Sequence, residues 1–202
     1  MYRPNDKFSQ KARELGYRSR SVFKLAEIDR KYNILKRGMA VLDLGSAPGS
    51  WLQYASENIG PSGRLYGLDL QEIAPLQQNN VKVFKADIFN DEFLKQIFDN
   101  LQFDAVISDL APSTSGFKVT DTAVSLELLD RAWEIAKKRL KTNGNFVGKV
   151  FAGEDLRGWF SGFKKYFKMS KRYKPHSSRE ESKELFVIGT GYKKISTWLY
   201  WL

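Results

Sequence analysis

Two different periods of apolar and polar positions run along this 202-residue chain. Strand-like runs occupy residues 39–44, 64–70, 81–88, 103–112, 145–153, 168–175 and 184–193. Apolar residues spaced three or four positions apart predict helices at 19–35, 50–59, 91–101, 121–141 and 155–167. Asn143 and Gly144 predict the end of the longest helix. Strands that alternate with helices in this order predict a mostly parallel sheet covered on both faces.

The loop after the first predicted strand is unusual. Residues 45–50 read Gly-Ser-Ala-Pro-Gly-Ser, six small residues between a buried strand and a helix. Ligands of open parallel sheets bind at the carboxyl ends of the strands, so a nucleotide-like cofactor is expected here. The loop has no lysine, which excludes a phosphate-binding P-loop, and it lacks the Gly-x-Gly-x-x-Gly spacing that favours a dinucleotide. A third candidate is S-adenosylmethionine, whose carboxylate can accept backbone N–H groups near a helix N-terminus.

Three aspartates lie at or near the ends of successive predicted strands. Asp69 ends the second strand, where a carboxylate can accept both hydroxyls of a ribose. Asp87 ends the third and can accept from an adenine amino group, and Asp43 precedes the small-residue loop and can orient it or meet an ammonium group. Each aspartate alone could equally be a loop or helix cap. Three together favour a cofactor site.

The charge is unevenly distributed. The net charge is +10, but residues 1–37 and 163–194 each carry +7, whereas residues 38–162 carry −4. Two basic ends around an acidic middle suggest a surface that binds a polyanion, most simply nucleic acid. Seven aromatic residues lie among these charges, and some of them could stack on bases while others pack in the core. They are Tyr2, Phe8, Tyr17, Phe23, Tyr166, Phe167 and Tyr173.

Composition narrows the class of protein further. There is no cysteine and His176 is the sole histidine, which leaves almost nothing for a zinc site, a disulfide scaffold or a Ser-His-Asp triad. No run is long enough to span a membrane, and the N-terminal residues do not resemble a secretory signal. We therefore expect one domain over 1–202 in a monomeric, cytoplasmic protein without a metal.

Seven motifs follow one another over roughly residues 15–192, namely SRSVFKLAEID, DLGSAPGSW, GLDL, KADI, SDLAPSTSG, GKVF and SRxxSKE. In sequence and order they resemble the RrmJ/FtsJ family of ribose 2′-O-methyltransferases. The resemblance implies an α/β fold of the Rossmann-like class I methyltransferase type, with a seven-stranded sheet whose last strand is antiparallel. It also implies S-adenosylmethionine as cofactor and S-adenosylhomocysteine as product. By position, the residues that would line or shape the cofactor site are Gly45, Gly49, Trp51, Asp69, Asp87 and Asp109.

Two lysines stand in unusual surroundings. Lys149 lies within a predicted buried strand, where an unpaired lysine is rare, and Lys24 adjoins apolar helix positions, where it could also be an ordinary surface lysine. Asp109 and Glu184 lie at strand ends and could compensate both charges. The four residues resemble the family's Lys-Asp-Lys-Glu tetrad, in which Lys149 would accept the proton of the ribose hydroxyl and Lys24 would orient the ribose. Alternatively, the lysines only steer the hydroxyl and no base acts.

A ribose 2′-hydroxyl as target implies RNA rather than DNA. Substrates of the family include a uridine in the A loop of 23S-type ribosomal RNA, anticodon-loop riboses of tRNA and cap riboses. We favour large-subunit ribosomal RNA in an assembling particle, because SDLAPSTSG resembles the bacterial ribosomal branch and no separate RNA-binding domain is evident. The alternatives are a tRNA methyltransferase, a non-catalytic RNA-binding assembly factor and a NAD-linked oxidoreductase.

Two segments depart from the family's pattern. Residues 113–116 read Ser-Thr-Ser-Gly where the ribosomal branch usually has a loop of the Asn-Met-Ser-Gly type. The tail 194–202 is rich in aromatic residues and has no family counterpart that we can place. We expect this tail to pack against the domain, and an interaction surface is the alternative.

Overall fold

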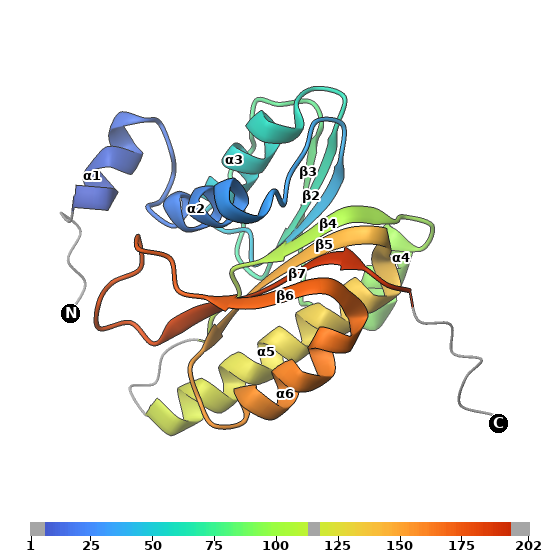
Figure 1. The fold of residues 1–202 in the computed structure, drawn as a ribbon. Helices are drawn as coiled ribbons and strands as arrows, with labels where there is room; N and C mark the ends of the chain where they lie inside the picture. The colour runs from blue at the N-terminus through green and yellow to red at the C-terminus, as the bar shows by residue number, and fades with distance from the viewer. Residues whose placement is uncertain (1–6, 113–117, 195–202) are drawn as a thin grey trace.

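A computed structural model describes residues 7–112 and 118–194 of the chain. Its seven strands form a single sheet in the order β3-β2-β1-β4-β5-β7-β6 (Figure 1). The strands are β1 (Ala40–Leu44), β2 (Arg64–Asp69), β3 (Val81–Lys85), β4 (Phe103–Ser108), β5 (Leu140–Phe151), β6 (Phe167–Tyr173) and β7 (Glu184–Tyr192). The helices are α1 (Lys7–Glu14), α2 (Val22–Tyr32), α3 (Ser50–Ile59), α4 (Asp91–Phe98), α5 (Lys118–Arg139) and α6 (Leu156–Phe163), with a short 3-10 turn at Lys164–Tyr166.

The sheet has the predicted directions. β1 pairs in parallel with β2 and β4, and further parallel pairs join β2 to β3 and β4 to β5. β7 runs antiparallel to both of its neighbours, β5 and β6. The predicted seven-stranded α/β sheet with an antiparallel last strand is therefore confirmed. The chain order reverses between β1 and β4, and ligands of open parallel sheets bind at the carboxyl ends of the strands at such a reversal.

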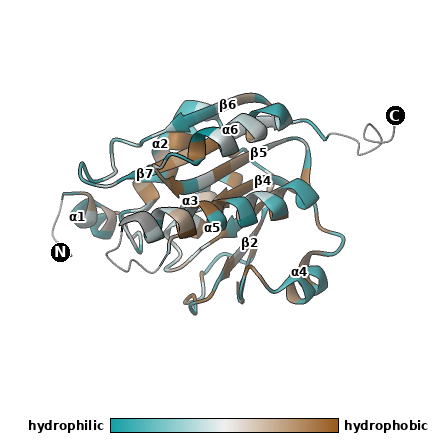
Figure 2. Ribbon diagram, turned by 90° about the horizontal axis from the view of Figure 1, so that it is seen from below, coloured by the Kyte–Doolittle hydropathy of each residue, from teal (hydrophilic) through white to brown (hydrophobic). Residues whose placement is uncertain are grey.

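Two hydrophobic clusters fill the space between the sheet and its helices. One face packs against α2 and α3 through residues such as Leu25, Ile28 and Leu52, which are fully buried. The other face packs against α4, α5 and α6 through residues such as Phe98 and Trp133. Figure 2 shows hydrophobic strands in the centre of the molecule and hydrophilic segments on the outer helices. Every residue of β1 is buried, and all except Asp43 are apolar, because the strand is covered on both faces.

One predicted boundary is wrong. The longest helix ends at Arg139, and β5 begins at once with Leu140, which pairs with Phe103 of β4. Asn143 has a left-handed φ of 66°, but it lies inside β5 next to an irregular step in the pairing with β4. The burial of Leu140 in the sheet thus overrides the local signal that Asn143 and Gly144 provide for a helix end.

Smaller differences concern lengths. β3 ends at Lys85, so Asp87 lies two residues beyond the strand instead of at its end. α6 ends at Phe163, because Phe167 is already buried as the first residue of β6. α1 has no counterpart among the predicted elements. The loop departure at 113–116 and the aromatic tail, except for residue 194, lie outside the described residues.

Candidate active site

The small-residue loop connects β1 to α3 and approaches the end of β4 closely. Gly45 has φ +79°, and a Cβ atom there would lie 2.9 Å from the backbone nitrogen of Leu110. The backbone N–H of Ala47 donates to Oδ2 of Asp69 at 2.9 Å, which ties the loop to the end of β2. Glycine at position 45 is therefore required both by backbone conformation and by space.

A cavity of about 410 Å³ opens at the carboxyl ends of β1, β2 and β4. Four of the predicted cofactor residues line it, namely Gly45, Asp69, Asp87 and Asp109. Leu110, Ile88 and Leu128 add apolar wall. A cavity at this edge of the sheet that combines converging polar groups with apolar side chains is typical of a nucleotide-like ligand site.

The aspartates at this edge differ in their surroundings. Asp69 accepts backbone N–H groups at both oxygens, from Gln71 at 2.8 Å and from Ala47. Asp87 is exposed and accepts from the backbone N–H of Phe89 at 2.9 Å. Each carboxylate oxygen has a second lone pair, so both side chains keep capacity for hydroxyl or amino donors of a ligand.

Asp43 is the most unusual of these carboxylates. It is fully buried, and neither of its carboxylate oxygens has a hydrogen-bond partner in the described part of the chain. Burial raises the pKa of Asp43 well above its usual range, and the nearby charges of Asp109 and Asp69 raise it further. Asp43 itself does not line the cavity, but Asp69 and Asp109 beside it do, and three carboxylates gathered at this edge fit a ligand that brings positive charge. S-adenosylmethionine carries an ammonium and a sulfonium, so these residues fit it.

Gly49 and Trp51 lie behind the loop rather than among the residues that line the cavity. Gly49 precedes α3 with φ +110°, and a Cβ atom there would lie 2.7 Å from Nη1 of Arg18. Trp51 is almost completely buried, and its indole N–H donates to the backbone oxygen of Ser21 at 2.9 Å. In this structure both residues hold the loop and α3 against the segment that leads into α2.

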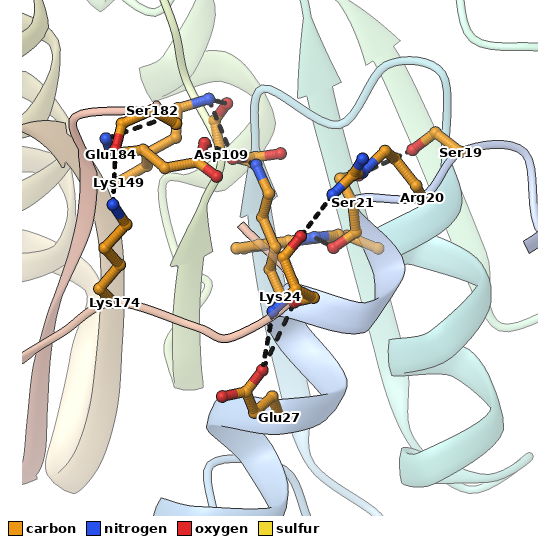
Figure 3. Close-up of polar contacts among 12 residues, drawn as sticks. Ser19, Arg20, Ser21, Lys24, Glu27, Asp109, Lys149, Lys174, Ser182 and Glu184 are labelled. Atoms are coloured by element: carbon orange, nitrogen blue, oxygen red, sulfur yellow. Dashed lines mark hydrogen bonds and ion pairs between the residues drawn. The ribbon is translucent and has the colours of Figure 1, made fainter. Parts of the chain in front are cut away.

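The tetrad residues form two lysine–carboxylate pairs (Figure 3). Nζ of Lys24 lies 2.6 Å from Oε2 of Glu184, and Nζ of Lys149 lies 2.9 Å from Oδ1 of Asp109. Lys149 also donates to the backbone oxygen of Asp109 at 2.6 Å. All four side chains are largely buried, with 8–16% of each exposed. Such pairing is what allows lysines to be buried.

The strand register brings these residues to one edge. Lys149 follows Val147 by two residues, so its side chain lies on the face of β5 that packs against α2 and α3. Glu184 opens β7 and pairs with Phe151, again on that face. Asp109 follows β4 directly and also lines the cofactor-sized cavity. Asp109 therefore joins the tetrad to that cavity.

Two residues that support the site were missed by the sequence analysis. Arg18 donates to the backbone oxygens of Pro48, Ala74 and Pro75 and so clamps the small-residue loop. Glu27 accepts the hydroxyl of Tyr173 and the backbone N–H groups of residues 176 and 177. The only available signal was their position, since Glu27 lies in the motif SRSVFKLAEID and Arg18 directly precedes it and counted simply as positive charge.

In the described ranges 7–112 and 118–194, no group of three or more His, Cys, Asp or Glu side chains could hold a metal ion. The same ranges contain no helix that is both long and apolar enough to cross a membrane.

The chain is similar to proteins of a known family and to a solved structure. The chain matches the FtsJ-like methyltransferase family over residues 17–192. A protein of Oleidesulfovibrio alaskensis named ribosomal RNA large subunit methyltransferase E is 44% identical, over 96% of this chain and 94% of the relative. A protein of the same name from Methanocaldococcus jannaschii is 41% identical, over 95% of this chain and 80% of the relative.

A solved structure is also similar. A crystal structure from Plasmodium falciparum, described as that of a ribosomal RNA methyltransferase, superposes with a TM-score of 0.75 at 26% identity. The match covers 87% of this chain and 98% of that chain. The family match extends over most of the chain and includes the loop, the strand-end aspartates and both lysine–carboxylate pairs. This protein belongs to the FtsJ-like methyltransferase family.

Proposed function

We propose that this protein methylates a ribose 2′-hydroxyl of large-subunit ribosomal RNA, at a uridine of the A loop, with S-adenosylmethionine as methyl donor. One observation carries the proposal. Asp109 lines a cavity of cofactor size and is also paired with Lys149, so a bound methyl donor and a lysine amine would meet at one residue. The names of the curated relatives support the choice of ribosomal RNA.

The cofactor would be held by the carboxylates and the small-residue loop. Asp109 would face its positive charges, Asp43 would support the small-residue loop from behind, and Asp69 and Asp87 would accept from its ribose and adenine. Gly45 leaves the space that the loop needs. When bound, S-adenosylmethionine supplies a methyl group that its sulfonium already activates, so the protein must mainly align the target oxygen and remove its proton.

Lys149 would accept the proton of the target 2′-hydroxyl at Nζ. It must be unprotonated to do so, and its side chain is buried beside Val147 and Phe186, close to Asp109. Lys24 would stay paired with Glu184 and hold the ribose oxygens. Alignment of the target oxygen and removal of its proton contribute separately to the rate. General-base catalysis typically raises the rate by about 10²–10⁴-fold.

The target would be presented by the ribosomal particle itself. The chain has basic segments at both ends, and in the described residues these reach the site through α2 and through the β6–β7 segment. A single methyltransferase domain with such a surface suits an RNA that the ribosome has already shaped, in the cytoplasm. A monomer is sufficient for this mode of binding.

The test is methyl transfer from tritiated S-adenosylmethionine to large subunits that lack 2′-O-methylation, with tRNA assayed in parallel. We expect label in ribosomal RNA ribose with the wild type and none with Lys149→Ala. Label in tRNA instead would refute the ribosomal substrate and keep the chemistry. No label with cofactor still bound would refute the enzyme and point to a non-catalytic assembly factor.

A further inference from the structure

A second cavity, of about 570 Å³, lies between α1, α2 and the loop that joins β6 to β7. Figure 1 shows this loop extending past α2 toward α1. Three aromatic residues line the cavity, Phe8 from α1, Phe23 from α2 and Tyr173 from β6. We call these three residues together with Lys11 and Lys31 the aromatic pocket. It is separate from the cofactor cavity and takes no part in the chemistry described above.

The structure selects these rings from the aromatic residues among the basic segments. Phe167 is buried in the core, Tyr166 packs on Trp133 with ring centroids 5.4 Å apart, and the hydroxyl of Tyr17 donates to Glu57. By contrast, Phe8 is 36% exposed and its ring centroid lies 5.6 Å from that of Phe23. The rings of the aromatic pocket are therefore in reach of a ligand.

A lysine ammonium group lies beside two of the three aromatic rings of the pocket. Nζ of Lys31 lies 4.3 Å from the ring centroid of Tyr173, and Nζ of Lys11 lies 5.7 Å from that of Phe23. Arg30 also lines the cavity. Within the described residues, none of these three cations forms an ion pair with a carboxylate. Their charges are therefore available to a ligand with negative groups.

The carboxylate that lines the cavity is already engaged. Glu27 accepts from the Tyr173 hydroxyl and from the backbone N–H of His176 at 2.9 Å and of Ser177 at 3.3 Å. Burial alone would raise the pKa of Glu27, but these hydrogen bonds outweigh it and lower the pKa. Glu27 thus braces the loop, and three cations against one carboxylate leave the pocket positive.

The aromatic pocket borders the tetrad. Phe23 and Lys24 are consecutive, and Glu27 is one helical turn further along α2, about 5 Å away. Arg20 connects the two regions, since its guanidinium lies 5.3 Å from the ring centroid of Phe8 and it also lines a pocket with Lys24 and Glu184. Figure 3 shows Arg20 in the turn that leads into α2, and Lys24 and Glu27 on the helix itself. An RNA strand whose target ribose is held at Lys24 would therefore pass directly over the aromatic pocket.

We propose that the aromatic pocket binds an unpaired nucleobase of a nucleotide that neighbours the target ribose, with Lys11, Arg30 and Lys31 on the adjoining phosphates. This inference rests on the proposed function and adds a second contact with the RNA. Aromatic rings stack on any base, and single-stranded RNA offers bases free of their helix. An acidic peptide would use the cations but would leave the exposed rings without a role.

The experiment measures binding of an A-loop stem-loop RNA by fluorescence anisotropy, together with KM and kcat for methyl transfer to large subunits that lack 2′-O-methylation. Phe8→Ala and Lys31→Ala test the pocket. The matched controls are Leu15→Ala, which removes a side chain on a residue that is 57% exposed near the same helix, and Lys36→Ala, which removes an exposed cation beyond α2. Each variant is also tested on RNAs with an abasic site at each position flanking the target.

We expect Phe8→Ala to weaken RNA binding and raise KM roughly tenfold, with kcat and cofactor affinity unchanged. An abasic site at one of the flanking positions should weaken RNA binding by the wild type to a similar extent. The same abasic site should not weaken RNA binding by Phe8→Ala any further. The inference would be overturned if the pocket variants bound the RNA as tightly as the wild type. It would also be overturned if every abasic site reduced the affinity of Phe8→Ala as much as that of the wild type. If only Lys31→Ala bound the RNA more weakly, and no abasic site changed the affinity, the inference would be overturned in favour of an acidic ligand or a contact with phosphates alone.

The same experiment separates the two proposals. Wild-type protein that binds the stem-loop but transfers no methyl group to the large subunits refutes the proposed function, and the anisotropy data still decide whether the pocket holds a base. Wild-type protein that methylates normally, with no change in KM for either pocket variant, refutes the pocket and leaves the function standing. Wild-type protein that does not bind the stem-loop refutes the pocket as well.

Discussion

Nζ of Lys149 lies 2.9 Å from Oδ1 of Asp109 and 2.6 Å from the backbone oxygen of the same residue. The lysine belongs to β5 and the aspartate follows β4, so two neighbouring parallel strands fix the contact. Because Asp109 also lines the cofactor-sized cavity, the position of the amine relative to that cavity is set by the sheet rather than by a loop. Rigid placement of this kind is what alignment of reacting groups requires.

Lys149→Ala should reduce kcat for methyl transfer by about 10²–10⁴-fold, because the proposed proton acceptor is lost. Binding of S-adenosylmethionine, measured by calorimetry, should change only a few-fold. The matched control is Lys141→Ala, since Lys141 pairs with Asp104 at 2.9 Å between the same two strands but at their other, exposed end. The proposed role of Lys149 fails if both variants lose activity equally or if Lys149→Ala remains active.

Asp43→Asn should raise the melting temperature of the ligand-free protein at pH 8 and weaken cofactor binding roughly tenfold or more. The folded-state pKa of Asp43 is raised, so the folded protein holds a proton that the unfolded chain releases. Its contribution to stability therefore falls as the pH rises from the unfolded pKa toward the folded one.

Thermal melts from pH 4 to pH 8 check this sign. The gain from Asp43→Asn should be small at pH 4 and largest at pH 8, with about 2–4 °C for each kcal/mol in a chain of this size. Asp99→Asn is a suitable control, because Asp99 is exposed at the end of α4. A gain that is independent of pH would argue against a protonated Asp43.

Gly49→Ala should destabilise the protein by about 1–3 kcal/mol and weaken cofactor binding, because the new methyl group meets Nη1 of Arg18 at 2.7 Å in a left-handed conformation. Moving Arg18 would release its hydrogen bonds to Pro48, Ala74 and Pro75. Chemical denaturation and calorimetry measure the two effects.

Gly158→Ala is the control for that substitution. Gly158 lies in α6, and a Cβ atom there would meet nothing within 4 Å. Alanine should leave stability unchanged or raise it by about 0.5–1 kcal/mol through helix propensity. Equal behaviour of the two alanine variants would mean that the contact with Arg18 does not hold the loop.

Glu27→Gln should lower kcat several-fold and leave cofactor affinity unchanged. The carboxylate braces the loop that leads to Glu184, and the amide replaces one acceptor oxygen by a donor group that faces the N–H groups of residues 176 and 177. The pKa of Glu27 is lowered in the folded state, so its stabilising effect is present above the unfolded pKa and is lost as the pH falls through the folded value.

Spectroscopic titration of Tyr173 provides a second readout for Glu27. Desolvation, the hydrogen bond to Glu27 and its charge together raise the pKa of Tyr173 to about 12. Glu27→Gln should bring that pKa down toward 10, whereas Glu57→Gln should not, because Glu57 contacts Tyr17 instead. A pKa of Tyr173 that does not change would contradict the brace.

The sequence by itself determined the sheet and the loop at its edge. The apolar runs of β1 and of the part of β5 around Lys149 identify strands that are buried on both faces. Only in such strands do apolar residues follow one another without alternating with polar ones. The small residues at 45–50 marked the loop, since a close approach of backbones excludes larger side chains. Local periodicity and residue size carry these features.

Only the tertiary structure decided which distant residues meet. Lys24 and Glu184 are 160 positions apart, and their contact depends on how α2 packs on β7. The selection of Phe8, Phe23 and Tyr173 as one pocket, and the place of Asn143 inside a strand, depend on packing and register in the same way. Contacts between segments far apart in the chain leave no local pattern, because their energy appears only once the sheet is assembled.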